Sequence, residues 1–350
     1  SIIELQSPCI TQISILQLEH KNCESMSKSV IIIRTICKER HIIMAAVVTE
    51  KIIEMFLILL GGVIVYKAGL IDDKTVPKLS NLLLMFISPL LIFQSYQMKF
   101  EMRLFYGLLW TLAASAVTFA VTIVLSELLF RKKGERTPVE KIAVIYSNSG
   151  FIGLPLINGI IGSEGIFYMT AYLTVFNLLL WTHGVLVMGS AGSFKEMCKN
   201  LLTPTIIAIF SGVVCFVTQL RLPEVLANPI QMIGNMNTPL AMIIAGANLA
   251  QGNLLKSLQN KRLYLLCAVK LILYPLVGLV ALWLLHLEFH IAFTVFIGMA
   301  CPAGASAIMF AERYGKDAKY ASEIFVVTTV LSAVSIPVLS VLAIRLLGAA

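Results

Sequence analysis

The sequence contains few charged residues. Aspartate, glutamate, lysine and arginine make up 13% of its 350 residues, roughly half of their share in an ordinary soluble domain. Hydrophobic residues account for 58%, and the mean hydropathy is +0.87. A water-soluble fold of this length cannot bury so much apolar surface, so the composition excludes a soluble protein and predicts one embedded in a lipid bilayer.

The motifs of common enzyme and metal-binding classes are also missing. The sequence has no Walker A motif, no HExxH, no GxSxG and no dinucleotide-binding fingerprint. Its seven cysteines form no CxxC pair and no Cys/His cluster at zinc spacing. We therefore expect no enzyme activity, no metal site and no cofactor, and we interpret the cysteines as small buried apolar residues.

The net charge of +8 does not indicate a nucleic-acid partner, because the basic residues occur in short runs between apolar segments. If the mature N-terminus is outside, sixteen of them fall in cytoplasmic loops and five outside, namely Lys51, Lys99, Arg103, Arg221 and Arg345. The positive-inside rule then predicts a multi-pass protein of the cytoplasmic (plasma) membrane with both termini extracytoplasmic.

Apolar stretches of about 18 to 25 residues recur along the chain, and each is long enough to cross about 30 Å of hydrocarbon. Ten spans are predicted, at 54–71, 76–96, 104–130, 139–161, 165–189, 203–220, 226–250, 262–285, 289–311 and 320–347. Residues 1–43 are more polar and lack a signal-peptide pattern. We interpret them as a non-native or disordered N-terminal extension.

Three cap-then-proline pairs predict helix starts: Thr137-Pro138, Thr203-Pro204 and Asn228-Pro229. Glu140 completes a capping box with Thr137.

The chain also carries signs of an internal repeat. Ser88-Pro89-Leu90 and Thr238-Pro239-Leu240 stand 150 residues apart, at similar places in the second and seventh spans. We predict an all-α membrane protein made of two five-helix repeats, 44–190 and 203–350, joined by a short cytoplasmic linker at 191–202. Because five is odd, the second repeat enters the membrane inverted, as in many secondary transporters.

The fourth and ninth spans are both interrupted by proline and glycine, which free backbone groups near the middle of the bilayer. Half-helix N-termini at such breaks attract an anion. The candidate binding residues at the breaks are Asn148, Ser149, Gly150, Pro155, Pro302, Ala303, Gly304 and Ser306. The alternative is that these kinks serve helix packing alone.

Polar side chains on other spans extend the candidate site. Asn177 in the fifth span, Ser88 in the second and Asn237 in the seventh could bind the same solute, or could form hydrogen bonds between helices. Lys270 and His183 are ionisable groups within spans and candidates for coupling or charge compensation, the alternative for Lys270 being that it snorkels or pairs structurally. Glu323 is a further coupling candidate, and the alternative that we favour is an acid facing a loop near Lys319.

The fourth, fifth and ninth spans resemble the auxin efflux carrier family. The resemblance lies in the string 148–156, in Gly162, Tyr172, Asn177 and Trp181-Thr182, and in Thr238-Pro239-Leu240-Ala241, Cys301-Pro302-Ala303 and Tyr314-Gly315. It implies ten helices in two inverted repeats, with helices four and nine crossing at broken centres. It also implies a scaffold of helices one, two, six and seven beside a moving transport domain, and a homodimer.

The same resemblance implies a substrate class. Plant PIN-FORMED carriers of this family carry auxin, and bacterial relatives are associated with malate, malonate or similar carboxylates. This chain is similar to the bacterial type because it has only residues 190–202 between helices five and six. We expect a secondary transporter that moves a small organic anion by elevator-like alternating access. An anion channel, or a carrier for a non-anionic solute, is the alternative.

Overall fold

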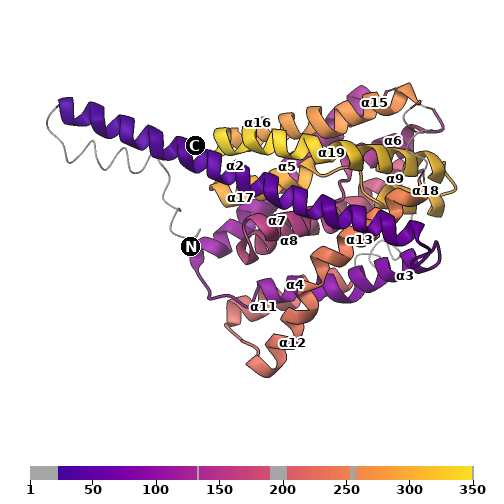
Figure 1. Ribbon diagram of the computed structural model, residues 1–350, viewed down its shortest axis with the longest axis horizontal. Coiled ribbons are helices and arrows are strands. Elements are labelled where there is room, and N and C mark those ends of the chain that lie inside the picture. The colour runs from indigo at the N-terminus through magenta and orange to yellow at the C-terminus, as the bar shows by residue number, and fades with distance from the viewer. Residues whose placement is uncertain (1–22, 132–133, 190–202, 253–256, 258, 349–350) are drawn as a thin grey trace.

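The structure is a computed structural model that describes residues 23–131, 134–189, 203–252, 257 and 259–348, with side chains from residue 44 onward. All regular elements in this part of the chain are helical (Figure 1). The predicted linker 191–202 and residues 1–22 of the predicted extension lie outside the described residues. Residues 23–43 are helical and continue without a break into the first predicted span.

The helices follow the predicted spans closely. The elements, with η marking a π-helical turn, are α2 (Cys23–Lys67), α3 (Thr75–Leu82), η2 (Leu83–Ile87), α4 (Ser88–Ser95), α5 (Met102–Leu129), α6 (Thr137–Ile145), η3 (Ser149–Gly153), α7 (Leu154–Ile160), α8 (Ser163–Leu179), η4 (Leu180–Gly184), α9 (Val185–Val187), α11 (Pro204–Thr218), α12 (Glu224–Asn235), α13 (Asn237–Gln251), α15 (Lys261–Ala268), η5 (Val269–Leu273), α16 (Tyr274–Leu284), α17 (Phe289–Ala300), α18 (Ser306–Arg313) and α19 (Ala318–Leu347).

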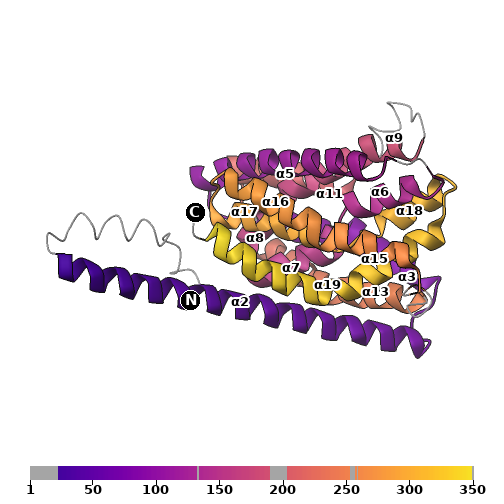
Figure 2. The same ribbon diagram turned by 90° about the horizontal axis from the view of Figure 1, so that it is seen from above.

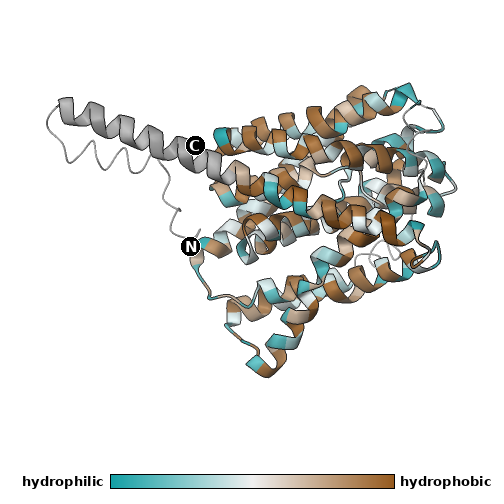
Figure 3. Cartoon of the chain, viewed as in Figure 1, coloured by the Kyte–Doolittle hydropathy of each residue, from teal (hydrophilic) through white to brown (hydrophobic). Residues whose placement is uncertain are grey.

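Within the described residues, five helical segments are long and apolar enough to cross a membrane: Thr75–Ser95, Met102–Leu129, Ser163–Val187, Lys261–Leu284 and Ala318–Leu347. Shorter apolar helices cover Ser149–Ile160, Pro204–Thr218 and Phe289–Ala300. Large apolar side chains such as Ile64, Phe210 and Val225 point outward, and Figure 3 shows the flanks of the helices as largely hydrophobic. A continuous exposed apolar surface of this kind suits a lipid environment.

The helices pack in two groups. In one group α2 lies along α13, while α4 packs against α11 and α12. In the other, α5, α8, α16, α17 and α19 form a packed bundle, with α6 and α18 at one end (Figures 1 and 2). The two groups also contact each other, through α2 with α19 and α4 with α8. The contact between α2 and α13 requires glycine, because a Cβ on Gly246 would lie 2.0 Å from the Leu59 carbonyl oxygen. Small residues let membrane helices approach this closely.

Proline positions explain three of the π-helical turns. Pro89, Pro155 and Pro275 are each the second residue of a helix that directly follows such a turn. A proline inside a continuous helix removes one hydrogen bond and clashes with the carbonyl of the preceding turn. An inserted residue in a π-helical turn relieves this conflict, so the helix continues with a local irregularity.

The helix-start predictions had mixed outcomes. Thr203 is confirmed as an N-cap, since its side chain accepts a hydrogen bond from Ile206 N. The capping box at Thr137 is wrong: α6 begins at Thr137 itself, and Glu140 instead bonds with residues of distant helices. The predicted start at Asn228 is also wrong, because Pro229 lies inside α12. That helix begins four residues earlier, at Glu224, after Pro223 at its N-cap.

Candidate functional site

Both proline- and glycine-rich spans are interrupted, and the two interruptions lie against each other. The first falls between α6 and η3, and the second between α17 and α18. Asn148 N donates to the Pro302 carbonyl at 2.8 Å, and Gly304 N donates to the Tyr146 carbonyl at 3.0 Å. This antiparallel contact is centred on Ser147 and Ala303. We call the paired stretches 146–148 and 302–304 the bridge.

The bridge depends on a glycine in the second interruption. A Cβ on Gly304 would lie 2.8 Å from Ser306 Oγ and 3.1 Å from the carbonyl oxygens of Ser147 and Tyr146. Gly150 in the first interruption has open space at the corresponding position. Close backbone approach therefore explains Gly304. It does not explain Gly150.

Several polar atoms beside the bridge are buried without a partner among the described residues. They are Asn148 Nδ2, Ser149 Oγ and Ser306 Oγ. Asn148 is 4% exposed and Ser149 is fully buried. Buried polar atoms in native proteins nearly always have a hydrogen-bond partner, so three unpartnered atoms around one bridge are suited to bind a ligand.

Lys270, in the π-helical turn η5, reaches the first interruption and the end of the helix that precedes the second. Its Nζ donates to Ser147 Oγ at 2.5 Å and to the Met299 carbonyl at 3.3 Å. Lys270 is 1% exposed, and in the described part of the chain no carboxylate forms an ion pair with it. A buried ammonium group without a counter-ion is costly. An anionic ligand would supply the missing charge.

A small cavity lies beside the Lys270 side chain. Its volume is about 10 Å³, enough for about one water position. Hydroxyl-bearing side chains line part of the cavity wall, namely Thr118, Thr122, Ser147, Tyr172 and Tyr274. In the conformation described here the space is too small for an organic acid.

Ser88 and Asn237 lie together, as the repeat would place them. Ser88 Oγ donates to Asn237 Oδ1 at 2.7 Å, and both side chains are buried. The bond joins α4 to α13, and α13 also contacts η3 next to Asn148. This hydrogen bond between helices leaves Asn237 Nδ2 without a partner among the described residues.

The remaining candidates lie outside the bridge. Asn177 Nδ2 donates to the Leu173 carbonyl of its own helix at 2.8 Å. His183 Nδ1 contacts Tyr146 OH at 3.0 Å and so touches the residue that opens the first interruption. Glu323 is half-buried in the second turn of α19. Pro155 is buried at the second position of α7, directly after η3, and Gly150 lies within η3.

Two residues at the bridge were absent from the predicted site. Ser147 adjoins Asn148, and its polar side chain next to the predicted break could have indicated a role. Thr328 accepts a hydrogen bond from Ala303 N at 3.2 Å. Nothing near Thr328 in the sequence marks it, because it lies 25 residues after Ala303 on another helix.

The chain was compared with known proteins. A family model described as "Membrane transport protein" matches residues 47–197 and 191–340. This chain belongs to that family, which includes the auxin efflux carriers. The curated relatives of this membrane transport protein include an "uncharacterized transporter" of Methanothermobacter thermautotrophicus, 25% identical over 301 residues that cover 84% of this chain and 97% of the relative. Both findings indicate an integral membrane transporter.

Proposed function

We propose that this protein is a secondary transporter for a small organic anion, a carboxylate such as malate, malonate or an auxin-like acid. The observation that carries the proposal is the position of Lys270, a buried cation whose Nζ donates to Ser147 Oγ in the first interruption and to the Met299 carbonyl, two residues before the second. The Lys270 ammonium and the Asn148 amide would donate charge-assisted hydrogen bonds to the carboxylate. Ser149, Ser306 and backbone groups freed at the breaks would complete its coordination.

Alternating access accounts for the size of the cavity. A space of about 10 Å³ cannot admit a dicarboxylate, so a carboxylate enters only if helices around the bridge move. The two packing groups supply the moving parts: the group containing α5, α8, α17 and α19 would move, elevator-like, against the group containing α2, α4, α11 and α13. A channel would instead need a continuous pore.

In this proposal the chain crosses the plasma membrane ten times, as inverted repeats 44–190 and 203–350 with both termini extracytoplasmic. The interrupted pairs α6–α7 and α17–α18 would be the crossing spans. Protomers would form the homodimer that the family resemblance implies, and His183 or Glu323 would serve coupling. Asn177 would join the site only if its bond to Leu173 broke.

Thermal stabilisation of the purified protein tests the proposal, because a ligand that binds only the native state raises apparent stability. We would measure unfolding temperature against mono- and dicarboxylates, with indole-3-acetate included. One carboxylate class should raise it. Asn148→Ala should abolish that shift without altering the ligand-free unfolding temperature, while Asn177→Ala serves as the matched asparagine control.

A shift that survives Asn148→Ala would overturn the site assignment. No shift with any anion would instead favour a carrier for a neutral or cationic solute. Single-channel currents in planar bilayers would identify the alternative anion channel.

A further inference from the structure

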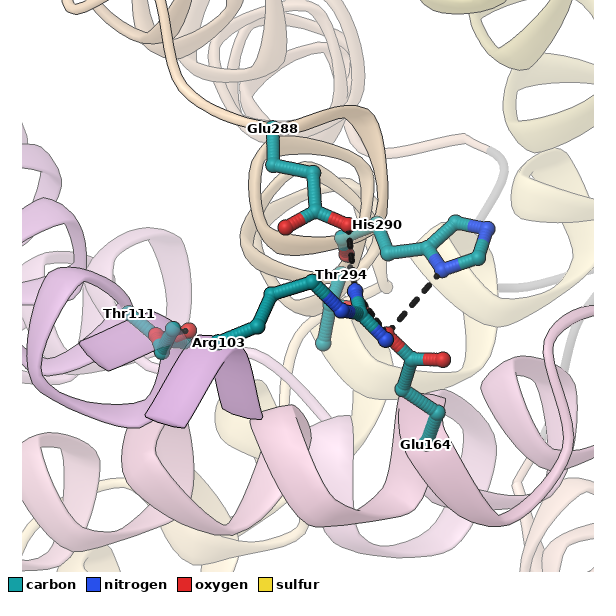
Figure 4. Close-up of polar contacts among 7 residues, drawn as sticks. Arg103, Thr111, Glu164, Glu288, His290 and Thr294 are labelled. Carbon is teal, nitrogen blue, oxygen red and sulfur yellow. Dashed lines mark hydrogen bonds and ion pairs between the residues drawn. The ribbon is translucent and has the colours of Figure 1, made fainter. Parts of the chain in front are cut away.

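Two arginine-centred clusters lie at opposite ends of the helix group that carries the bridge. At one end, Arg103 Nη1 donates to Glu164 Oε1 at 3.0 Å and to Glu288 Oε1 at 2.6 Å (Figure 4). His290 Nδ1 lies 3.3 Å from Glu164 Oε1. We call Arg103, Glu164, Glu288 and His290 the Arg103 cluster.

The second cluster is built around Arg262. Its Nε and Nη2 donate to the two carboxylate oxygens of Glu140 at 2.9 and 2.8 Å. Tyr320 OH donates to Glu140 Oε1 at 2.9 Å, and Arg136 lies over the Tyr320 ring. We call Arg262, Glu140, Tyr320 and Arg136 the Arg262 cluster. In Figure 2, α17, which carries part of the first cluster, lies toward one end of the helix bundle. α6 and α15, which carry part of the second cluster, lie toward the other end.

The two clusters use equivalent positions in the two halves of the chain. Arg103 is the second residue of α5, and Arg262 is the second residue of α15. Their partners lie at the start of the helix that leads to a break, with Glu288 at the N-cap of α17 and Glu140 in the first turn of α6. A third residue in each cluster comes from the first turn of another helix. It is Glu164 of α8 in the Arg103 cluster and Tyr320 of α19 in the Arg262 cluster.

The Arg103 cluster is not interpreted as a metal site. Ligand atoms of Glu164, Glu288 and His290 lie within 4.8 Å of one another. The Arg103 guanidinium, however, already binds both carboxylates, so it occupies the position where a cation would bind.

We propose that Arg103 and Arg262 are equivalent positioning residues that fix the two broken helices relative to each other. Glu288 stands about 20 Å along the helix from the break in α17, and Glu140 about 10 Å from the break in α6, at 1.5 Å per residue. Each arginine anchors the outer end of one broken helix to the two helices beside it. Loss of either anchor lets that helix slide or tilt, and the bridge separates.

The role of this positioning in ligand binding rests on the proposed function, so the test has a readout that needs no ligand. Cys301 is fully buried at the start of the second interruption. In a variant that keeps Cys301 as the sole cysteine, its reaction with N-ethylmaleimide reports opening of the bridge. Carboxylate binding by thermal shift is measured in parallel.

Arg103→Gln and Arg262→Gln should each raise the Cys301 labelling rate roughly fivefold, because local opening becomes more frequent. Each should weaken carboxylate binding by about fivefold, within the range seen for remote coupling. Arg103→Lys and Arg262→Lys should fall between the glutamine variants and the parent protein, since lysine keeps the charge but not the two-pronged geometry. Lys51→Gln, which breaks the exposed Lys51–Glu54 pair, is the matched control.

Unchanged labelling in both glutamine variants would overturn the proposal, and so would an effect at one end only. If the parent protein binds no carboxylate while labelling still rises in both variants, the positioning role stands and the proposed substrate class fails. A variant that elutes as an aggregate is replaced in the comparison by its lysine counterpart, for which unchanged labelling also overturns the proposal.

Discussion

The two interrupted spans meet at one bridge but contribute different chemistry to it. The first interruption provides side chains, since polar atoms of Asn148 and Ser149 have no partner among the residues that the structure describes. The second mainly provides backbone, the Pro302 carbonyl and the Gly304 amide. Lys270 bonds to Ser147 in the first interruption and to Met299, just before the second. The two interruptions thus differ in the side-chain atoms they place at the bridge, while both contribute backbone hydrogen bonds to it.

Removing the shared cation should have the largest effect. Lys270→Met keeps the side-chain volume but loses the charge, so carboxylate binding should weaken by about 10- to 100-fold, as for a lost charge-assisted hydrogen bond. The ligand-free protein should keep its unfolding temperature or gain stability, because an uncompensated buried charge is gone. A large loss of stability in the ligand-free protein would show that Lys270 has a packing role instead.

Replacing one glycine in each interruption with alanine tests whether the two interruptions differ in how tightly their backbones pack. Gly304→Ala should separate the bridge and destabilise the protein by roughly 1–3 kcal/mol, a typical cost of overpacking. Gly150→Ala should be tolerated, because its Cβ would meet no atom within 4 Å. The measurement is the unfolding temperature of each variant in detergent. Equal losses of unfolding temperature in the two variants would contradict the inference that only the second interruption needs a glycine for close backbone packing.

Thr328 holds the backbone of the second interruption through a hydrogen bond with Ala303 N. Thr328→Val removes the acceptor for Ala303 N at nearly constant volume, and an unpartnered buried N–H costs about 1–3 kcal/mol. We expect lower thermal stability with unchanged carboxylate affinity, since Thr328 supports backbone and does not face the proposed ligand. A selective loss of affinity would instead place Thr328 in the binding site.

The smallest expected effect is a difference in carboxylate affinity between alanine variants of two serines, one in each interruption. Ser149→Ala should weaken carboxylate binding by about two- to tenfold, the range for one hydrogen bond. Ser306→Ala should change it less, because Ser306 is only half-buried. Titration calorimetry on both variants gives the comparison. A larger effect at Ser306 would move recognition to the second interruption.

Helix positions were predictable because they depend on local composition. Helical elements cover most of each predicted range, although only five segments of the described chain are long and apolar enough to cross a membrane. Thr203 caps α11 as expected. Local sequence patterns gave wrong predictions where residues distant in sequence bind the same side chain. Glu140 matched a capping box, but Arg262 and Tyr320, 122 and 180 residues away, bind its carboxylate. Pro229 suggested a helix start, yet α12 accommodates it in its second turn.

The sequence by itself determined that this protein lies in a membrane, where its helices run and where two of them break. Those features follow from hydropathy and from the missing N–H and Cβ of proline and glycine. The family resemblance predicted that the broken helices cross, but only the tertiary structure decided which residues pair in the bridge and that Lys270 bonds to Ser147 and Met299 beside it. The residues concerned are far apart in sequence, Ser147 and Lys270 by 123 positions. Such contacts depend on how whole helices pack, which local residue patterns do not specify.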